Sequence, residues 1–151
     1  MNQNNGGLNF RAGQTGSITA RLNIVSVEDA NIEGVNNVHS IKIGYADSDG
    51  AETASRVQLT IRSHPFNAAI PPSNQPIFTF DSNTRASTGA GSVTVALNDC
   101  PGNTLDFDFS QFAYWVEAVI TRTDVAQTPA FNLIQIGETT MAACPDRKSV
   151  V

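Results

Sequence analysis

The sequence predicts an all-β protein, an antiparallel β-sandwich of the immunoglobulin-like or jelly-roll type with about eight strands and no significant helix. Apolar residues alternate with polar ones in short runs, which is the pattern of strands with one buried face. Gly, Pro, Asn, Asp and Ser separate these runs, and helical periodicity is missing between them. The runs are residues 17–24, 38–45, 56–62, 77–80, 93–97, 105–109, 112–121 and 131–136.

The chain of 151 residues is long enough for one domain with a sizeable core. We expect a sandwich over residues 17–138, a polar N-terminal arm over 1–16 and a C-terminal tail over 139–151. The arm is rich in Asn, Gly and Gln, and Leu8 and Phe10 are the residues that would anchor it. They would dock on this subunit or on a neighbouring one, so both are candidate assembly-interface residues.

The first run keeps its apolar residues on one face until the phase slips at Val25, as in a β-bulge. Between the second and third runs, Asp47-Ser48-Asp49-Gly50 is a strong turn signal, so we expect these two strands to form an antiparallel hairpin. The outward positions of that hairpin would gather Lys42, Arg56 and Arg62 into one basic patch. Such a patch could bind an anion or simply keep the surface soluble.

The middle of the chain changes character at residues 63–76, where four prolines exclude regular pairing and predict the longest loop. A short strand over 77–80 follows, and then a strand over 93–97. In the run 105–109, Leu, Phe and Phe alternate with two aspartates, which predicts a half-buried strand.

Residues 112–121 are apolar on both faces, so this strand is either central in a covered sheet or part of an interface. Tyr114 and Trp115 are neighbours and must point to opposite faces. Trp115 is therefore covered by a second layer, buried in an assembly interface, or exposed as a platform for sugar rings. For ligand binding, Phe66 and His64 in the proline-rich loop are the companion candidates.

The net charge of −5 argues against nucleic acid as a partner, because phosphate binding needs a basic surface. No apolar run approaches the roughly 20 residues that cross a bilayer, so membrane insertion is not expected. Only 15% of the residues are charged, and this weakly charged, Thr-rich composition favours an extracellular or virion protein. The first residues lack the pattern of a secretory signal, and the localisation stays open.

Cys100 and Cys144 both precede proline, which favours extended or turn backbone beside a strand. A disulfide between them would tie the C-terminal tail to the loop after residues 93–97, stabilising the fold by roughly 3–4 kcal/mol in the loop-entropy model. The alternative is two unpaired thiols in a reducing compartment.

Two groups of carboxylates could carry chemistry. Asp47, Asp49 and Glu52 lie within six residues and resemble half of a calcium loop, although Asp and Gly also suit an ordinary turn. Calcium is therefore the one cofactor considered. Asp106 and Asp108 would project from one strand face about 7 Å apart, as in a glycosidase pair or on a solvated outer face.

Motifs for a serine nucleophile, a P-loop, a dinucleotide site or a zinc protease are missing from the sequence, so we expect no enzyme. The favoured function is a non-catalytic structural subunit that assembles with copies of itself, as in a virion, fibre or surface layer. The alternative is a carbohydrate-binding module, with or without calcium. A glycoside hydrolase is the third hypothesis.

Overall fold

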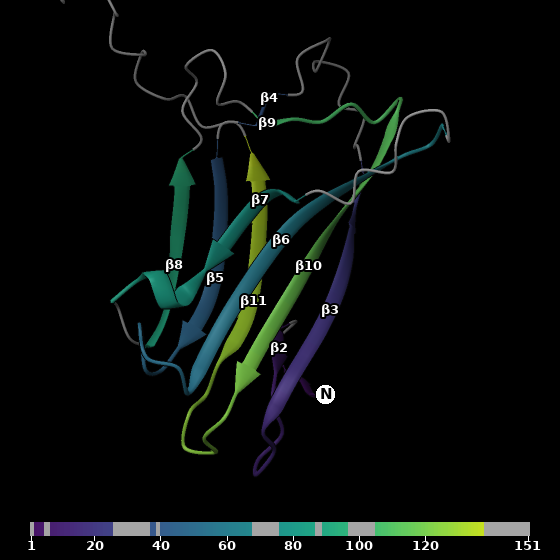
Figure 1. The fold of residues 1–151 in the computed structure, drawn as a ribbon. Coiled ribbons are helices and arrows are strands. Elements are labelled where there is room, and N and C mark those ends of the chain that lie inside the picture. The colour runs from purple at the N-terminus through teal and green to yellow at the C-terminus, as the bar shows by residue number, and fades with distance from the viewer. Residues whose placement is uncertain are drawn as a thin grey trace, which may run out of the picture.

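The computed structural model describes residues 2–4, 7–25, 37–38, 40–67, 76–86, 89–96 and 105–137. They form two antiparallel β-sheets packed face to face, so the predicted β-sandwich is confirmed (Figure 1). The one helical element in these ranges is a single 3-10 turn, η1 (Ser82–Thr84). None of the described residues belongs to a helix that is long and apolar enough to cross a membrane.

Each sheet has its own strand order, and a third, two-stranded ladder lies apart from both. The five-stranded sheet has the order β1 (Asn2–Asn4), β2 (Gly7–Asn9), β11 (Ala130–Gly137), β5 (Ser40–Asp47), β8 (Gly89–Ala96). The four-stranded sheet has the order β3 (Gly16–Ile24), β10 (Phe112–Arg122), β6 (Ser55–Pro65), β7 (Pro76–Asp81). The third ladder pairs β4 (Asn37–Val38) with β9 (Leu105–Asp106).

The chain passes from one large sheet to the other at almost every connection. Within the two sheets, only β1–β2 and β6–β7 are sequential neighbours that stay together. Leaving out β1, each sheet contributes four strands whose order interleaves in the jelly-roll manner. The immunoglobulin order, with three strands in one sheet, does not fit. Strand order therefore decides between the two topologies that the sequence left open.

The expected hairpin between the second and third runs is wrong. β5 lies in the five-stranded sheet and β6 in the four-stranded sheet, so the loop between them crosses from sheet to sheet. Asp49 closes this loop by accepting hydrogen bonds from the N–H groups of Ala54 (2.7 Å) and Ser55 (3.0 Å). Turn residues mark a change of direction, but they do not distinguish a hairpin from such a crossover.

Because β5 and β6 lie in different sheets, the basic patch expected on their hairpin does not form. Lys42 belongs to β5 of one sheet, whereas Arg56 and Arg62 belong to β6 of the other. Arg56 pairs with Asp81, and Arg62 lies 3.6 Å from Glu117. The three cations therefore do not form a common anion site.

Residues of the expected N-terminal arm join the five-stranded sheet as β1 and β2. Leu8 lies opposite Phe131 of β11 and is only 7% exposed, so of the two expected dockings the structure shows the one on its own subunit. Three-residue strands with a single apolar side chain show no periodicity, which is why the sequence pattern did not predict them. β11 supplies the ladder that holds β2, and β2 in turn pairs with β1.

Phe10 is also anchored within the subunit, through Arg122 at the end of β10. The guanidinium carbon of Arg122 lies 4.9 Å from the centre of the Phe10 ring. Arg122 is 4% exposed and donates hydrogen bonds to the main-chain carbonyls of Arg11 (2.9 Å), Gln14 (2.5 Å) and Gln127 (3.3 Å). This buried arginine fastens the β2–β3 connection to the central strand of the opposite sheet.

The core is one layer of side chains between the two sheets. Its central members come from β5, β6 and β10 and show almost no exposed surface. They are Ile41, Ile43, Val57, Leu59, Ile61, Val116, Ala118 and Ile120. The period-two pattern predicted this layer correctly, because alternate residues of a strand face the same side of the sheet.

Several strand boundaries differ from the expectation. β6 continues to Pro65 and β7 begins at Pro76, so residues 63–65 and 76 belong to strands and not to the expected loop. β8 begins at Gly89 and not at residue 93. The sequence pattern missed this beginning because the first four residues are small and exposed and carry no apolar alternation. The strand expected over 105–109 ends at Asp106 and gives way to a turn before β10. Cys100, Cys144 and the expected tail over 139–151 lie outside the described residues, so their disulfide stays a prediction.

We predict that Leu59→Ala lowers the free energy of unfolding by about 2–5 kcal/mol, because a fully buried leucine leaves a cavity. Thr60→Ala is the matched control, since the neighbouring side chain on β6 points away from the core and should cost less than about 1 kcal/mol. Urea unfolding monitored at equal m-values measures both. Equal losses in the two variants would contradict the sandwich register.

Candidate functional site

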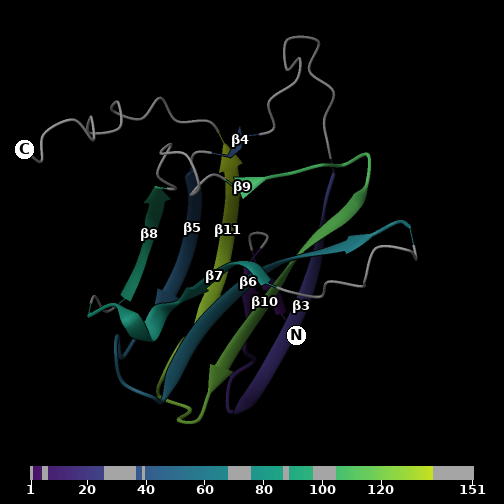
Figure 2. The same cartoon turned by 45° about the horizontal axis from the view of Figure 1, so that its top comes forward.

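The main candidate site is an aromatic hollow at one end of the four-stranded sheet. Figure 2 shows this end, where β3 and β6 end and β10 begins. The hollow has a volume of about 380 Å³, and we call it the Trp115 hollow. The register places these three strand ends side by side, with Phe112 opposite Pro65 and Tyr114 opposite Ile24. Its lining is Asn23, Ile24, Val25, Phe66, Phe109, Phe112, Ala113, Tyr114 and Trp115.

Packed aromatic rings stiffen one side of this hollow. Tyr114 points into the core, with Phe107 and Phe109 against its ring at centroid distances of 4.7 and 5.1 Å. The two phenylalanines stack on each other at 5.7 Å. The Tyr114 hydroxyl accepts a hydrogen bond from the Asp108 N–H at 2.8 Å, which fixes the turn before β10. The hollow therefore has a preformed wall.

Trp115 lies on the outer face of the four-stranded sheet, opposite Asn23 of β3 and Arg62 of β6. Its side chain is partly buried, and its indole Nε1 is shielded from solvent without a hydrogen-bond partner. An indole N–H that is buried usually finds an acceptor. The hollow thus offers one unused donor beside its apolar walls.

The rim of the hollow is strongly apolar and exposed. Val25 and Phe66 are 72% and 65% exposed, the two highest values among the large apolar residues of the described part. The Phe66 N–H donates to the carbonyl of Gln111 at 2.8 Å, so this exposed residue is tied to the start of β10. Sequence reasoning selected Trp115 and Phe66, and the structure brings them together.

Other candidate ligand residues lie differently. His64 is exposed on β6 opposite Ala113, and it does not line the hollow. The sequence pattern did not select Phe109 and Phe112, because it assigned both to ordinary buried strand positions. The break in apolar alternation at Val25 was the signal in the sequence that could have pointed to the rim of the hollow.

Charged side chains lie beside Trp115 on the outer face and pair with one another. Glu117 forms an ion pair with Arg21 of β3 (2.9 Å) and lies 3.6 Å from Arg62 of β6. These contacts cross all three strands next to the hollow. The carboxylate is therefore engaged within the sheet, and the polar lining of the hollow itself is neutral.

The expected carboxylate pair for glycoside hydrolysis is not formed as a strand-face pair, since β9 ends at Asp106. Asp108 accepts hydrogen bonds from the Ser110 hydroxyl (2.5 Å), the Ser110 N–H (3.0 Å) and the Gln111 side chain (2.7 Å). These hydrogen bonds lower the pKa of Asp108, and the one from the Ser110 hydroxyl has the largest effect. A carboxylate held in this way stabilises a turn and makes a poor general acid.

The candidate calcium residues belong to the crossover between β5 and β6. Asp47 is fully buried, and the Ser55 hydroxyl contacts both Asp47 and Asp49. Burial opposes ionisation of Asp49, but the hydrogen bonds from Ser55 and Ala54 outweigh it and lower its pKa. Glu52 is exposed, and its main-chain carbonyl accepts from Asn83 at 2.6 Å. Among the described residues, no group of three or more His, Cys, Asp or Glu could hold a metal ion. The calcium site therefore stays a prediction.

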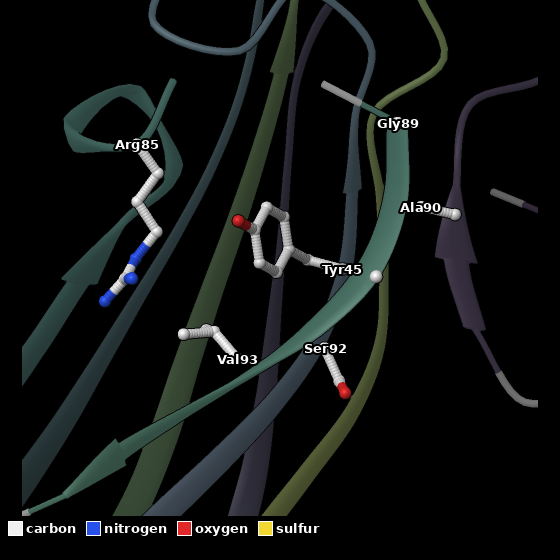
Figure 3. Close-up of a pocket in the computed structure, with 7 residues that line it drawn as sticks. Tyr45, Arg85, Gly89, Ala90, Ser92 and Val93 are labelled. Carbon is white, nitrogen blue, oxygen red and sulfur yellow. The ribbon is translucent and has the colours of Figure 1, made fainter. Parts of the chain in front are cut away.

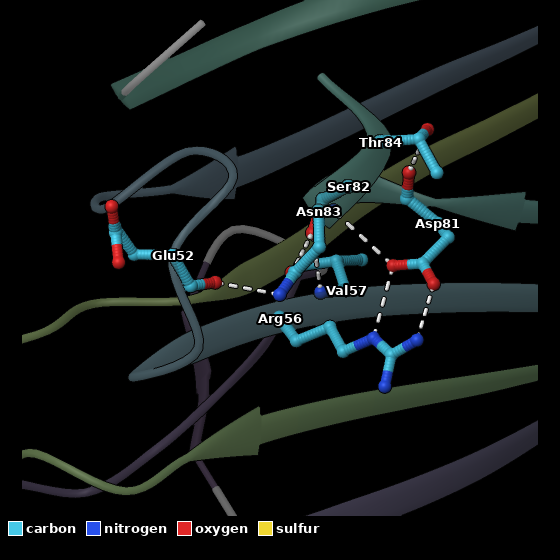
Figure 4. Close-up of polar contacts among 7 residues, drawn as sticks. All are labelled: Glu52, Arg56, Val57, Asp81, Ser82, Asn83 and Thr84. Carbon is cyan, nitrogen blue, oxygen red and sulfur yellow. Dashed lines mark hydrogen bonds and ion pairs between the residues drawn. The ribbon is translucent and has the colours of Figure 1, made fainter. Parts of the chain in front are cut away.

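A polar network joins η1 to β6 near the edge of the four-stranded sheet that lies opposite to β3 (Figure 4). Arg56 forms a bidentate ion pair with Asp81. The buried Ser82 hydroxyl accepts a hydrogen bond from the Val57 N–H at 2.8 Å. The Arg56 guanidinium is the foremost cause of the lowered pKa of Asp81. Asp81 also accepts the Asn83 N–H at 3.2 Å and so caps η1.

No protein-family model matches the chain, and no curated protein sequence matches it. The chain is similar to a solved structure described as the cryo-EM atomic structure of broad bean stain virus, with a TM-score of 0.40 and 13% identity. The match covers 91% of this chain and 90% of that chain. A likeness at this level carries no inference about function.

We predict that Asp81→Asn lowers the free energy of unfolding at pH 7 by about 1 kcal/mol or less, the usual range for an exposed ion pair. The asparagine keeps an oxygen for the Asn83 N–H. Because the folded-state pKa of Asp81 is lowered, the pair contributes fully above the ordinary value of 3.8 and is lost as the pH falls through the folded value.

Urea midpoints of the wild type and Asp81→Asn should therefore converge in acid. An Arg56→Gln variant is the control, and combining it with Asp81→Asn should add little to either single change. A difference that stays constant down to the lowest pH would show that the ion pair is not its source.

Proposed function

We propose that the protein is a non-catalytic structural subunit that assembles with copies of itself, and that the Trp115 hollow is part of the contact. The observation that carries this proposal is the pair of exposed apolar residues on the rim, Val25 and Phe66. Burying a side chain of this size contributes about 1.5–3 kcal/mol. Exposed apolar residues gathered at one concave place are typical of protein–protein contacts.

The neighbouring strand favours a second copy as the occupant. β3 has nine residues and is an edge of the four-stranded sheet, paired with β10 alone among the described strands. Leu22 on this strand is 43% exposed, so the apolar surface continues from the hollow along the edge. Two β3 edges related by a twofold axis could pair antiparallel and bring both hollows to the same contact.

The indole of Trp115, which is partly buried and lines the hollow, fits the same arrangement. Tyr, Trp and Phe are the residues that dominate the centres of such interfaces. The hollow therefore supplies an aromatic centre, and β3 supplies a backbone edge beside it.

We predict that light scattering on a sizing column gives a mass well above 16.1 kDa for the wild type at micromolar concentration. The double change Val25→Ser and Phe66→Ser should return monomers, because it removes the apolar rim. Val125→Ser is the matched control, since Val125 is 56% exposed but does not line the hollow. A wild-type protein that elutes as a monomer at every concentration would contradict assembly.

The second candidate is a carbohydrate-binding module, favoured by the juxtaposition of Trp115 and Phe66 with the amide of Asn23. Sugar rings stack on indole faces, and amide groups hydrogen-bond hydroxyls. The chain has a single tryptophan, so its fluorescence reports on this hollow directly.

We expect a saturable change in that fluorescence with a bound monosaccharide, lost in Phe66→Ser and kept in Val125→Ser. An unchanged signal across neutral, amino and acidic sugars would remove this candidate. Calcium assistance would appear as a melting temperature lowered by chelation in the wild type and unaffected in Asp49→Asn.

A further inference from the structure

A second cavity lies at the opposite edge of the sandwich, between η1 after β7 and the beginning of β8 (Figure 3). It has a volume of about 270 Å³ and is lined mainly by Tyr45, Arg85, Val93 and the backbone of residues 89–92. The volume suits a small organic molecule. The cavity is separate from the Trp115 hollow, since the two share no lining residue.

Gly91 creates much of this space. It lies opposite Tyr45 in the β5–β8 ladder, and Val93, which is partly buried, lies opposite Ile43 in the same phase. A Cβ placed on Gly91 would meet no atom within 4 Å, so the position toward the cavity is empty. The backbone of Gly91 is not in the left-handed region, and a side chain there would fill the cavity without backbone strain.

Arg85 brings an unused cationic donor to the cavity. Its Nε is shielded from solvent and has no hydrogen-bond partner. The guanidinium carbon lies 5.6 Å from the centre of the Phe80 ring, which holds the side chain at this edge. Carboxylates of the described residues make their ion pairs with Arg21, Arg56 and Arg62, and none of those pairs involves Arg85.

Tyr45 provides the second polar group. Its ring is 5% exposed and packs edge-on against Phe80 at a centroid distance of 5.1 Å, so its position is fixed by the core. Figure 3 shows the hydroxyl at the end of the ring that lies toward Arg85. A hydroxyl donor and a guanidinium donor therefore line one small cavity.

We propose that this cavity binds a small carboxylate, with the carboxylate accepting hydrogen bonds from the Arg85 guanidinium and the Tyr45 hydroxyl. The planar guanidinium fork matches the two oxygens of a carboxylate, and the Arg85 guanidinium makes no ion pair with a carboxylate of the described residues. Val93 and the ring of Tyr45 leave room for a short apolar or sugar-like remainder. This binding is independent of assembly through the Trp115 hollow.

The test is calorimetric titration of the full chain with four probes: acetate, glucuronate, glucose and inorganic phosphate. Acetate presents the carboxylate alone, glucuronate presents it on a sugar ring, and glucose presents the ring without it. We expect saturable binding of acetate, glucuronate or both, and none of glucose. Tighter binding of glucuronate than of acetate would identify a carboxylated sugar as the source, and the reverse would identify a simpler acid.

Two variants test the geometry in different ways. Arg85→Gln removes the charge and should weaken binding at least about ten-fold, the loss expected when a charged hydrogen bond is removed. Gly91→Val fills the opening and should abolish binding while the guanidinium stays. Thr94→Val is the matched control, because it places a valine on the exposed, opposite face of β8 and should bind like the wild type.

Several outcomes would overturn the proposal. They are equal binding by wild type and Gly91→Val, binding of phosphate without either carboxylate, or no saturable heat with any probe. A variant that loses binding must show the thermal unfolding transition of a folded protein. If Arg85→Gln does not fold, Gly91→Val decides the question by itself.

Discussion

The layer of aliphatic side chains between the two sheets is the constraint on which the rest of the structure depends. Its central residues on β5, β6 and β10 are buried almost completely and belong to one hydrophobic cluster. Because nearly every connection changes sheet, neighbouring strands in a sheet are usually distant in sequence. Backbone ladders therefore stabilise each sheet, while this layer holds the two sheets together.

Polar side chains close the margins of that layer, where strands leave one sheet for the other. Asp49 and Ser55 close the β5–β6 crossover, Ser82 takes the place of a ladder partner beside Val57, and Arg122 collects three carbonyls of two connections. Each of these groups is buried or half-buried and paired. A crossover exposes main-chain groups that a hairpin would pair, and these side chains satisfy them.

Both candidate sites lie at the margins of the core layer, where the packed side chains end. At the end of β10 the aromatic cluster around Tyr114 continues the core outward, and Trp115 and Phe66 extend it to the surface. At the edge of β8 the layer stops because Gly91 has no side chain to place there. The first site is apolar with one free donor, and the second is small and cationic. The two sites thus suit different partners, a protein surface and a small acid.

The sequence by itself determined the class of fold and the membership of the core. Alternation in a run such as 112–121 is a local property of the chain, and it required strands with one face buried. It also identified Trp115 and Phe66, since an aromatic residue in an outward phase or in a proline-rich loop is conspicuous without any structure.

Only the tertiary structure decided the partners of each strand. The turn at Asp49 has the same local chemistry in a hairpin and in a crossover, and β2 is too short to show a pattern before β11 pairs with it. The cavity beside Gly91 has the same origin, because Arg85, Tyr45 and Gly91 come from three separate segments. Burial against distant residues made these choices, and short-range residue preferences do not encode it.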